Sequence, residues 1–122
     1  MNKNWPAMTT ELTAAIREMR AGTPDVMKGF SALAQAALKP AALDTKTKEL
    51  IALAIAVATR CDGCVGFHAE AAVKQGATRD EVLETMGMAV YMGAGPSVMY
   101  AAQALEAFDQ FAAAKAPAPA AE

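Results

Sequence analysis

Both cysteines and the sole histidine of this 122-residue chain lie within eight consecutive positions. Cys61, Cys64 and His68 occur at i, i+3 and i+7, and on an α-helix this spacing places the three side chains along one stripe. A histidine one turn after a thiol can take up or return the thiol proton. The spacing therefore predicts a dithiol whose chemistry is assisted by an acid–base group.

The two cysteines are expected at the start of a helix that begins around Cys61 or Asp62 and ends near Gln75. The first turn of a helix has unpaired N–H groups and the positive end of the helix dipole, and both favour a thiolate. The thiolate is the reactive form of cysteine. Asp62 opposes this effect, because a nearby negative charge disfavours another one.

Glu49 joins these residues through the expected topology. If the helix that carries Glu49 and the helix that carries His68 form an antiparallel hairpin that turns near Arg60, the two side chains lie within about one helical turn of each other. A carboxylate at that place could orient and polarise the imidazole. We therefore predict a relay from Glu49 through His68 to Cys64, with Cys61 ready to close a disulfide.

The remaining sequence predicts an all-α domain of about six helices. No segment alternates apolar and polar residues over a useful length, whereas apolar residues recur with helical periods. Thr23, Asp44 and a Thr78–Glu81 capping box are expected at helix starts. The first expected helix contains Leu12 and ends at Gly22. The next five run from Thr23 to Pro40, from Asp44 to about Thr59, from Cys61 or Asp62 to Gln75, from Thr78 to Val90 and from Pro96 to Phe108. A turn at Gly93 to Pro96 is expected between the last two helices.

Composition supports one small domain. The chain is 54% hydrophobic, but 31 of its residues are alanine, so few large side chains are left for a core. We expect one domain over residues 1–111, a mobile Ala/Pro-rich tail over 112–122, and subunits that complete each other's core. The third expected helix is apolar all round, which is typical of a central, buried helix.

The charge balance and the first residues bear on partners and location. A net charge of −2 gives no basic surface for nucleic acid. The apolar stretches are too short or too interrupted to span a bilayer, and the first ten residues lack an apolar signal core. We therefore expect a cytoplasmic protein that binds neither nucleic acid nor membrane.

The site residues carry a resemblance to the carboxymuconolactone decarboxylase superfamily, within it to the alkyl hydroperoxidase D (AhpD)-like branch. Glu49 is followed after eleven residues by Cys61-Asp62-Gly63-Cys64 and then by Val65-Gly66-Phe67-His68, and the resemblance extends from about Pro40 to Phe108. It implies an all-α fold with a central helical hairpin carrying the CxxCxxxH motif, and assembly as homotrimers or homohexamers. Gly63 stands where AhpD proteins carry an additional histidine.

The resemblance also implies an activity and a role for each residue. Hydroperoxides are reduced, Cys64 attacks the peroxide, Cys61 resolves the sulfenic acid as a disulfide, and Glu49 and His68 relay protons. A thiol reductant, such as a lipoylated or thioredoxin-like protein, must restore the dithiol, since the chain has no second redox pair. No haem, flavin or nicotinamide signature occurs, so no cofactor is expected.

Several alternatives stay open. The chain could be a carboxymuconolactone decarboxylase-type, non-redox enzyme that uses Glu49 and His68, or a non-catalytic redox-sensing oligomeric protein. Zinc is a further alternative, because Cys61, Cys64 and His68 supply three of the four ligands it prefers, and Glu49 or a neighbouring subunit could complete the set. The plainest alternative is that the cysteines are small buried residues without chemistry.

Overall fold

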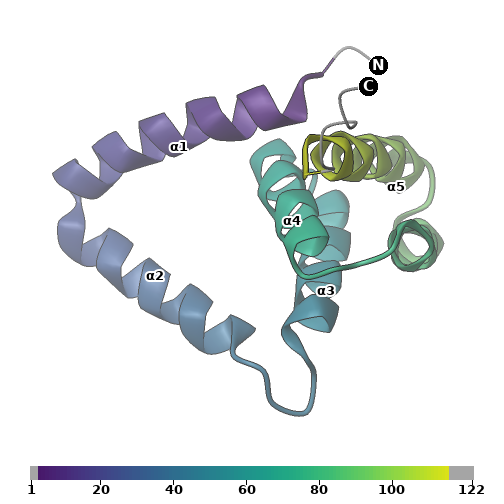
Figure 1. Ribbon diagram of the computed structural model, residues 1–122, viewed down its shortest axis with the longest axis horizontal. Helices are drawn as coiled ribbons and strands as arrows, with labels where there is room; N and C mark the ends of the chain where they lie inside the picture. Colours follow the sequence, from purple (N-terminus) through teal and green to yellow (C-terminus); the bar gives the residue numbers. More distant parts are fainter. Residues whose placement is uncertain (1–2, 116–122) are drawn as a thin grey trace, which may run out of the picture.

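The computed structural model describes residues 3–115, and the regular secondary structure of this part is entirely α-helical (Figure 1). This confirms the predicted fold class. The helices are α1 (Trp5–Gly22), α2 (Pro24–Leu38), α3 (Thr45–Thr59), α4 (Asp62–Lys74) and α5 (Arg79–Lys115).

Helix α5 combines the expected fifth and sixth helices, because the chain bends at Ala94 without a loop between two helices. Ala94 has φ 54° and ψ −142°, and Pro96 follows two residues later. Figure 1 shows that the two arms of α5 run in different directions. The two arms therefore correspond to the expected fifth and sixth helices, and the turn expected at 93–96 is present as the non-helical residue Ala94 between them. None of the described helices is both long and apolar enough to cross a membrane.

The last turns of α5 extend the helical structure past the expected domain boundary. Helix α5 continues to Lys115, whose ammonium group donates to the carbonyl oxygen of Val73 at 3.2 Å. Residues 112–115 of the expected tail are therefore helical and attached to α4. The rest of the expected tail, 116–122, lies outside the described residues.

Two of the expected helix starts are confirmed by side-chain hydrogen bonds. The Asp44 carboxylate accepts the N–H of the third residue after it at 2.7 Å. Thr78 and Glu81 form the full capping box, since the Thr78 hydroxyl accepts the Glu81 N–H at 3.1 Å and the Glu81 carboxylate accepts the Thr78 N–H at 2.8 Å. These local signals place the starts of α3 and α5 on either side of the cysteine helix.

Thr23 occupies the expected N-cap position of the second helix, with Pro24 as the first helical residue, but its side chain does not cap that helix. Its hydroxyl donates to the carbonyl oxygen of Met19 at 2.8 Å, so the side chain serves the end of α1 instead. Only one residue separates α1 from α2, and the carbonyl one turn back lies within reach. Thr23 therefore closes the first helix, and Pro24 starts the next without a side-chain cap.

Helices α3, α4 and α5 pack together into the main core, with the start of α1 laid across it. Completely buried side chains come from all of these elements: Trp5, Leu53, Val57, Val65 and Val82. Helix α3 is central but not buried all round as expected. Ile51 and Ile55 on its other face are 43% and 56% exposed.

Helix α2 differs from the rest because none of its residues is buried. Figure 1 shows α1 and α2 joined as an open V that extends away from the other helices. The apolar stripe predicted for this helix exists, but Val26, Phe30 and Leu33 are 61–69% exposed. Within the protomer, this stripe contributes almost nothing to the core.

Candidate redox site

The turn between α3 and α4 sets the position of the cysteines. Arg60 takes the left-handed conformation with φ 56°. Its N–H donates to Val57 O at 3.2 Å, and the Cys61 N–H donates to Ala56 O at 3.1 Å. This pair of bonds is the Schellman arrangement that satisfies the last carbonyls of a helix. The chain therefore reverses within two residues and starts α4 at once.

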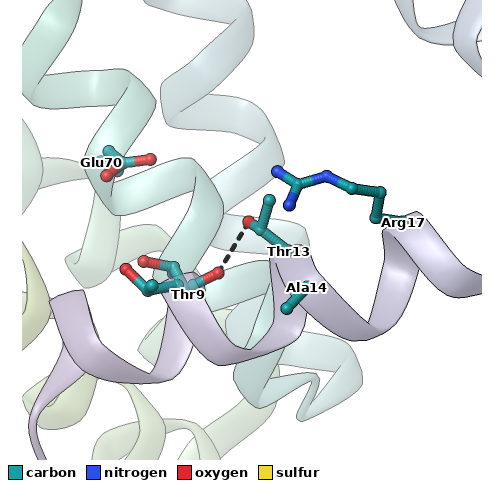
Figure 2. A pocket seen from close by; sticks show the side chains of 6 residues that line it. Thr9, Thr13, Ala14, Arg17 and Glu70 are labelled. Atoms are coloured by element: carbon teal, nitrogen blue, oxygen red, sulfur yellow. Dashed lines mark hydrogen bonds between the residues drawn. The ribbon is translucent and has the colours of Figure 1, made fainter.

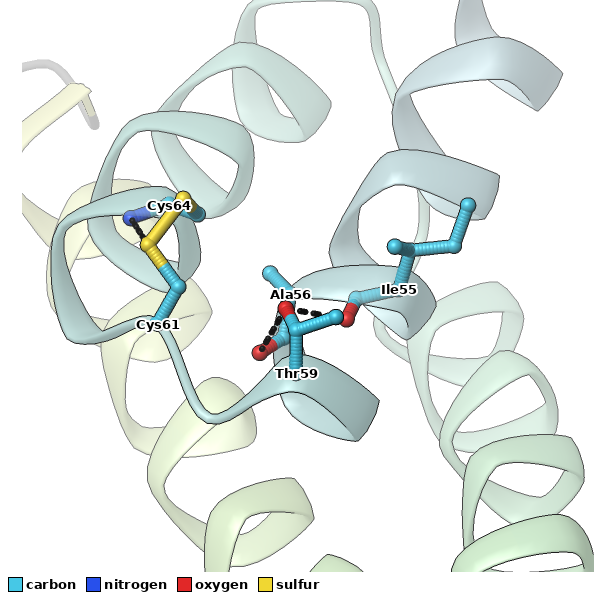
Figure 3. Close-up of a disulfide and its surroundings, with 5 residues drawn as sticks. All are labelled: Ile55, Ala56, Thr59, Cys61 and Cys64. Atoms are coloured by element: carbon cyan, nitrogen blue, oxygen red, sulfur yellow. Dashed lines mark hydrogen bonds between the residues drawn. A yellow bond between two sulfur atoms is a disulfide. The ribbon is translucent and has the colours of Figure 1, made fainter.

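Cys61 and Cys64 form a disulfide at the start of α4, as Figure 3 shows, with a Cα–Cα distance of 5.2 Å. Cys61 is the N-cap of the helix, and its sulfur accepts the backbone N–H of Cys64 at 3.2 Å. Both residues are half-buried. In the reduced protein, a thiolate at the N-cap would receive this N–H and the favourable end of the helix dipole.

Glu49 and His68 meet across the α3–α4 hairpin, where the predicted topology put them. The Nδ1–H group of His68 donates to Glu49 Oε2 at 2.7 Å, since an ionised carboxylate can only accept. Glu49 is only 4% exposed, and the imidazole satisfies this buried carboxylate. The contact occupies Nδ1, which leaves Nε2 as the ring nitrogen that can exchange a proton with another group.

His68 and Cys64 lie four residues apart on α4, so their side chains occupy successive turns of one helix face. The structure thus joins Glu49 to His68 and Cys61 to Cys64, and the two pairs lie one helical turn apart along α4. This arrangement can move a proton between a buried carboxylate–imidazole pair and a dithiol. The catalytic role of each residue stays a prediction.

The structure adds neighbours of the dithiol that sequence patterns missed. Asp62 follows Cys61, and its Oδ2 atom lies 2.8 Å from Lys3 Nζ. The hydrogen bond from Lys3 lowers the pKa of Asp62, and the hydrogen bond between Tyr100 and Asp62 raises the pKa of the phenol. Lys3 lies 59 residues from Asp62 in the sequence, so no local spacing could indicate the pair.

Residues 24–107 match the carboxymuconolactone decarboxylase family, and this segment includes all four predicted site residues. The chain belongs to this family. Helix α1 lies outside the matched segment, which covers α2, the α3–α4 hairpin and α5 as far as residue 107.

Solved structures of the family and a further relative resemble the chain over most of its length. A carboxymuconolactone decarboxylase family protein of Legionella pneumophila is 58% identical, with a TM-score of 0.87, over 88% of this chain and 96% of that one. A family member from Thermotoga maritima, described with a possible involvement in antioxidative response, is 28% identical, with a TM-score of 0.72, over 82% of this chain and 88% of that one. An uncharacterized protein of Cupriavidus necator is 38% identical over 109 residues, which cover 84% of this chain and 96% of the relative.

Helix α1 contacts α4 at Gly63, the position where the sequence departs from the AhpD pattern. A Cβ atom on Gly63 would lie 3.0 Å from Leu12 Cδ1, and a Cβ on Gly66 would lie 2.9 Å from Thr9 Cγ2. Helix α1 therefore packs directly on the glycine face of α4. A side chain at position 63 would press on the end of the Leu12 side chain.

The groove in Figure 2 lies between α1 and α4 and is separate from the predicted site residues. Its volume is about 280 Å³, and three threonines, an arginine and a glutamate provide its polar lining. The Thr13 hydroxyl is already bonded to Thr9 O at 2.7 Å. The groove is lined by Thr9, Thr10, Thr13, Ala14, Arg17 and Glu70.

The zinc alternative can be compared with the arrangement of possible ligands. Within residues 3–115, no group of three or more His, Cys, Asp or Glu side chains is placed to hold a metal ion. In the disulfide, the Cys61 and Cys64 sulfurs are bonded to each other. Zinc analysis of the reduced protein tests the alternative directly.

Proposed function

We propose that this carboxymuconolactone decarboxylase family protein is a thiol-dependent peroxidase that reduces hydroperoxides through Cys61 and Cys64. One observation carries the proposal. A disulfide-forming cysteine pair at a helix start lies one turn from a histidine that is bonded to a buried glutamate at 2.7 Å. A buried carboxylate–imidazole pair next to two thiols is the equipment needed for proton-coupled thiol oxidation.

The proposed cycle balances in three steps. The Cys64 thiolate attacks a peroxide oxygen, the O–O bond breaks, and a proton delivered by His68 leaves an alcohol and a Cys64 sulfenic acid. The Cys61 thiol then attacks the sulfenic sulfur, which forms the disulfide and releases water. Two thiol groups of an external reductant return the disulfide to the dithiol and become oxidised themselves.

The Glu49–His68 pair supplies proton transfer in this cycle. Glu49 holds the imidazole by Nδ1, which leaves Nε2 as the nitrogen that exchanges the proton in the proposed cycle. Cys61 serves as the resolving thiol and, as the N-cap, receives a backbone N–H. The proposed reductant is a lipoylated or thioredoxin-like protein, and the cytoplasm is the proposed location, since its thiol systems keep such dithiols reduced.

A homotrimer or homohexamer is part of the proposal. Large apolar side chains are exposed on α2, α3 and both arms of α5, and isolated soluble protomers rarely leave so many uncovered. The exposed set includes Phe30, Leu33, Ile55, Met88, Tyr91, Met92 and Met99. Light scattering at micromolar concentration tests this part, and a monomer would contradict it.

The experiment that tests the activity follows the loss of free thiols when reduced protein meets a hydroperoxide. We expect the wild type to lose both thiols much faster than free dithiothreitol, and His68→Ala to react about 100-fold more slowly, as general acid–base assistance is worth 10²–10⁴-fold. Cys64→Ser should form no intramolecular disulfide. Lys74→Ala, at the far end of α4, is the matched control and should react normally. A wild-type rate no faster than that of the free dithiol overturns the proposal.

The same sample separates the alternatives. Continuous peroxide consumption with an added dithiol reductant indicates an enzyme, whereas a single oxidation without turnover indicates a redox sensor. A carboxymuconolactone decarboxylase-type enzyme would use the Glu49–His68 pair without the thiols, so its activity would survive Cys61→Ser and Cys64→Ser. Stoichiometric zinc in the freshly purified protein would support the metal site instead.

A further inference from the structure

An ion pair that the proposed cycle does not use is formed by Asp62, the residue that follows Cys61 at the start of α4. Lys3 Nζ is 2.8 Å from Asp62 Oδ2 and donates to Gln103 Oε1 on α5 at 2.5 Å. Tyr100, also on α5, forms a hydrogen bond with the same carboxylate. The segment with Lys3 and helix α5 therefore both reach the residue that follows Cys61.

The segment that carries Lys3 is held firmly in place. Gln110 on α5 accepts the Trp5 N–H at 2.8 Å and donates to the carbonyl oxygen of Lys3 at 2.8 Å. The Trp5 indole is completely buried and donates to Glu106 at 3.1 Å. The Lys3 ammonium lies 5.2 Å from the centre of the Trp5 ring. These contacts restrict where the Lys3 charge can lie.

Asp62 is the carboxylate adjacent to Cys61, and on its own it would disfavour a thiolate at either cysteine. The bond from Lys3 holds the pKa of Asp62 below its usual range, so the carboxylate is ionised and its charge is offset at close range. Arg60 adds a second positive charge near Tyr100. The charged and titratable groups around the dithiol and Asp62 are Lys3, Glu49, Arg60, Asp62, His68 and Tyr100.

We propose that Lys3 is a positioning residue, which offsets the Asp62 charge and thereby keeps the reduced dithiol in its reactive thiolate form at neutral pH. Lys3 acts through Asp62 and need not touch a substrate. This inference deepens the proposed function, since it concerns the acidity of the same dithiol. It rests on the thiols being the reactive groups and makes no assumption about the peroxide.

The test measures alkylation of the reduced protein by iodoacetamide between pH 6 and pH 9. We expect Lys3→Met to alkylate about two- to five-fold more slowly than the wild type at pH 7, because a half-exposed ion pair has a modest effect. Lys3→Arg should behave like the wild type. In an Asp62→Asn background, which should itself react at least as fast as the wild type, Lys3→Met should have no further effect.

Controls separate this role from a structural one. Lys74→Met removes a lysine from the other end of α4, where it lies 3.8 Å from Glu70, and should leave the pH profile unchanged. High salt should shrink the difference between wild type and Lys3→Met, because screening weakens exposed ion pairs. An unchanged rate in Lys3→Met overturns the inference, as does equal slowing in the Asp62→Asn background.

The role of Lys3 can also be tested if the Lys3→Met variant does not fold or if the protein reduces no hydroperoxide. If Lys3→Met fails to fold, Asp62→Asn alone decides, and slower alkylation in that variant contradicts the inference. Because alkylation needs no peroxide, a protein that reduces no hydroperoxide can still show the Lys3 effect. Failure of the proposed function and failure of this inference are therefore distinguishable.

Discussion

Helices α2, α3 and α4 have similar lengths, but the α3–α4 hairpin is packed into the core whereas α2 is exposed. The hairpin buries Leu53, Val57 and Val65 completely and brings Glu49 to His68. Helix α2 carries an apolar stripe of its own, yet none of its residues is buried. Apolar periodicity alone therefore identifies a helix and its apolar face, but it does not identify the surface that packs against that face.

The hairpin therefore holds the candidate site, whereas α2 presents an exposed apolar face. Within one chain, the hairpin positions a complete set of thiols, imidazole and carboxylate. Helix α2 has a face that only another surface can cover, and a second copy of the chain is the occupant proposed above. Matched substitutions in the hairpin and in α2 test whether the two regions differ in this way.

The largest expected difference in the free energy of unfolding is between a leucine in the core and a leucine on α2. Leu53→Ala should lower the free energy of unfolding by about 2–5 kcal/mol, because it opens a cavity at a completely buried position. Leu33→Ala, at a position 64% exposed, should change it by less than about 0.5 kcal/mol in dilute protein. Urea unfolding at several protein concentrations measures both.

Concentration dependence is the sharper part of that test. The Leu53→Ala loss should be the same at all concentrations, whereas the Leu33→Ala loss should grow as assembly becomes important. Equal, concentration-independent losses would mean that α2 is packed within its own chain.

The next effect concerns the relay within the hairpin. Glu49→Gln should slow peroxide-dependent thiol oxidation by about 10- to 100-fold, because the imidazole loses the carboxylate that orients it and balances its charge. Glu70→Gln is the matched control on α4, since its only described ion pair is at 3.8 Å. Stopped-flow measurement of thiol loss decides, and a neutral Glu49→Gln would remove Glu49 from the mechanism.

Substitutions at two glycines inside helices should change the stability of the protein by smaller amounts and in opposite directions. Gly66→Ala should destabilise the protein by about 1–3 kcal/mol, because the new Cβ would press against α1 at 2.9 Å from Thr9. Gly29→Ala, in α2, meets nothing within 4 Å and should stabilise the protein by about 0.5–1 kcal/mol through helix propensity. Thermal unfolding followed by circular dichroism reads both signs. Destabilisation by Gly29→Ala would show that α2 is covered at that point.

The smallest effect is the acid sensitivity of the ion pair beside the dithiol. The Asp62 pKa is lowered from 3.8 by the bond from Lys3, so the pair stabilises the folded state above that pH. This stability is lost as the pH falls through the lowered value. Both side chains are about 40% exposed, so the contribution should stay below about 1 kcal/mol.

Unfolding free energies at pH 5 and pH 3 test this acid sensitivity. Between these values, the wild type should lose more stability than Asp62→Asn. An identical loss in the two proteins would mean that the ion pair adds nothing to the folded state.

The sequence allowed prediction wherever a signal was local. The Asp44 cap, the Thr78–Glu81 box and the CxxCxxxH spacing each involve residues within two turns, and the Glu49–His68 contact needed only one further assumption, the antiparallel hairpin. Thr23 lies at the predicted helix start, but its hydroxyl bonds to the end of α1 instead, because the ends of two helices lie within its reach.

Contacts between distant parts of the chain could not be predicted in this way. Nothing near Lys3 indicates Asp62, and nothing near Gly66 indicates that Thr9 covers it. Such pairs depend on how α1 lies across α4, which is a property of the whole packing. The exposure of α2 escaped prediction for the same reason, since a stripe shows the same period whether or not a surface covers it.

The central claim is that hydroperoxide oxidises the Cys61–Cys64 dithiol faster than it oxidises ordinary thiols. The most direct measurement mixes fully reduced protein with one equivalent of hydroperoxide in a rapid-mixing instrument and determines the products by mass spectrometry. We expect fast loss of two thiols per peroxide and a single new disulfide between Cys61 and Cys64. Intact thiols after free dithiothreitol has reacted, or oxidation beyond the disulfide as the main product, would contradict it.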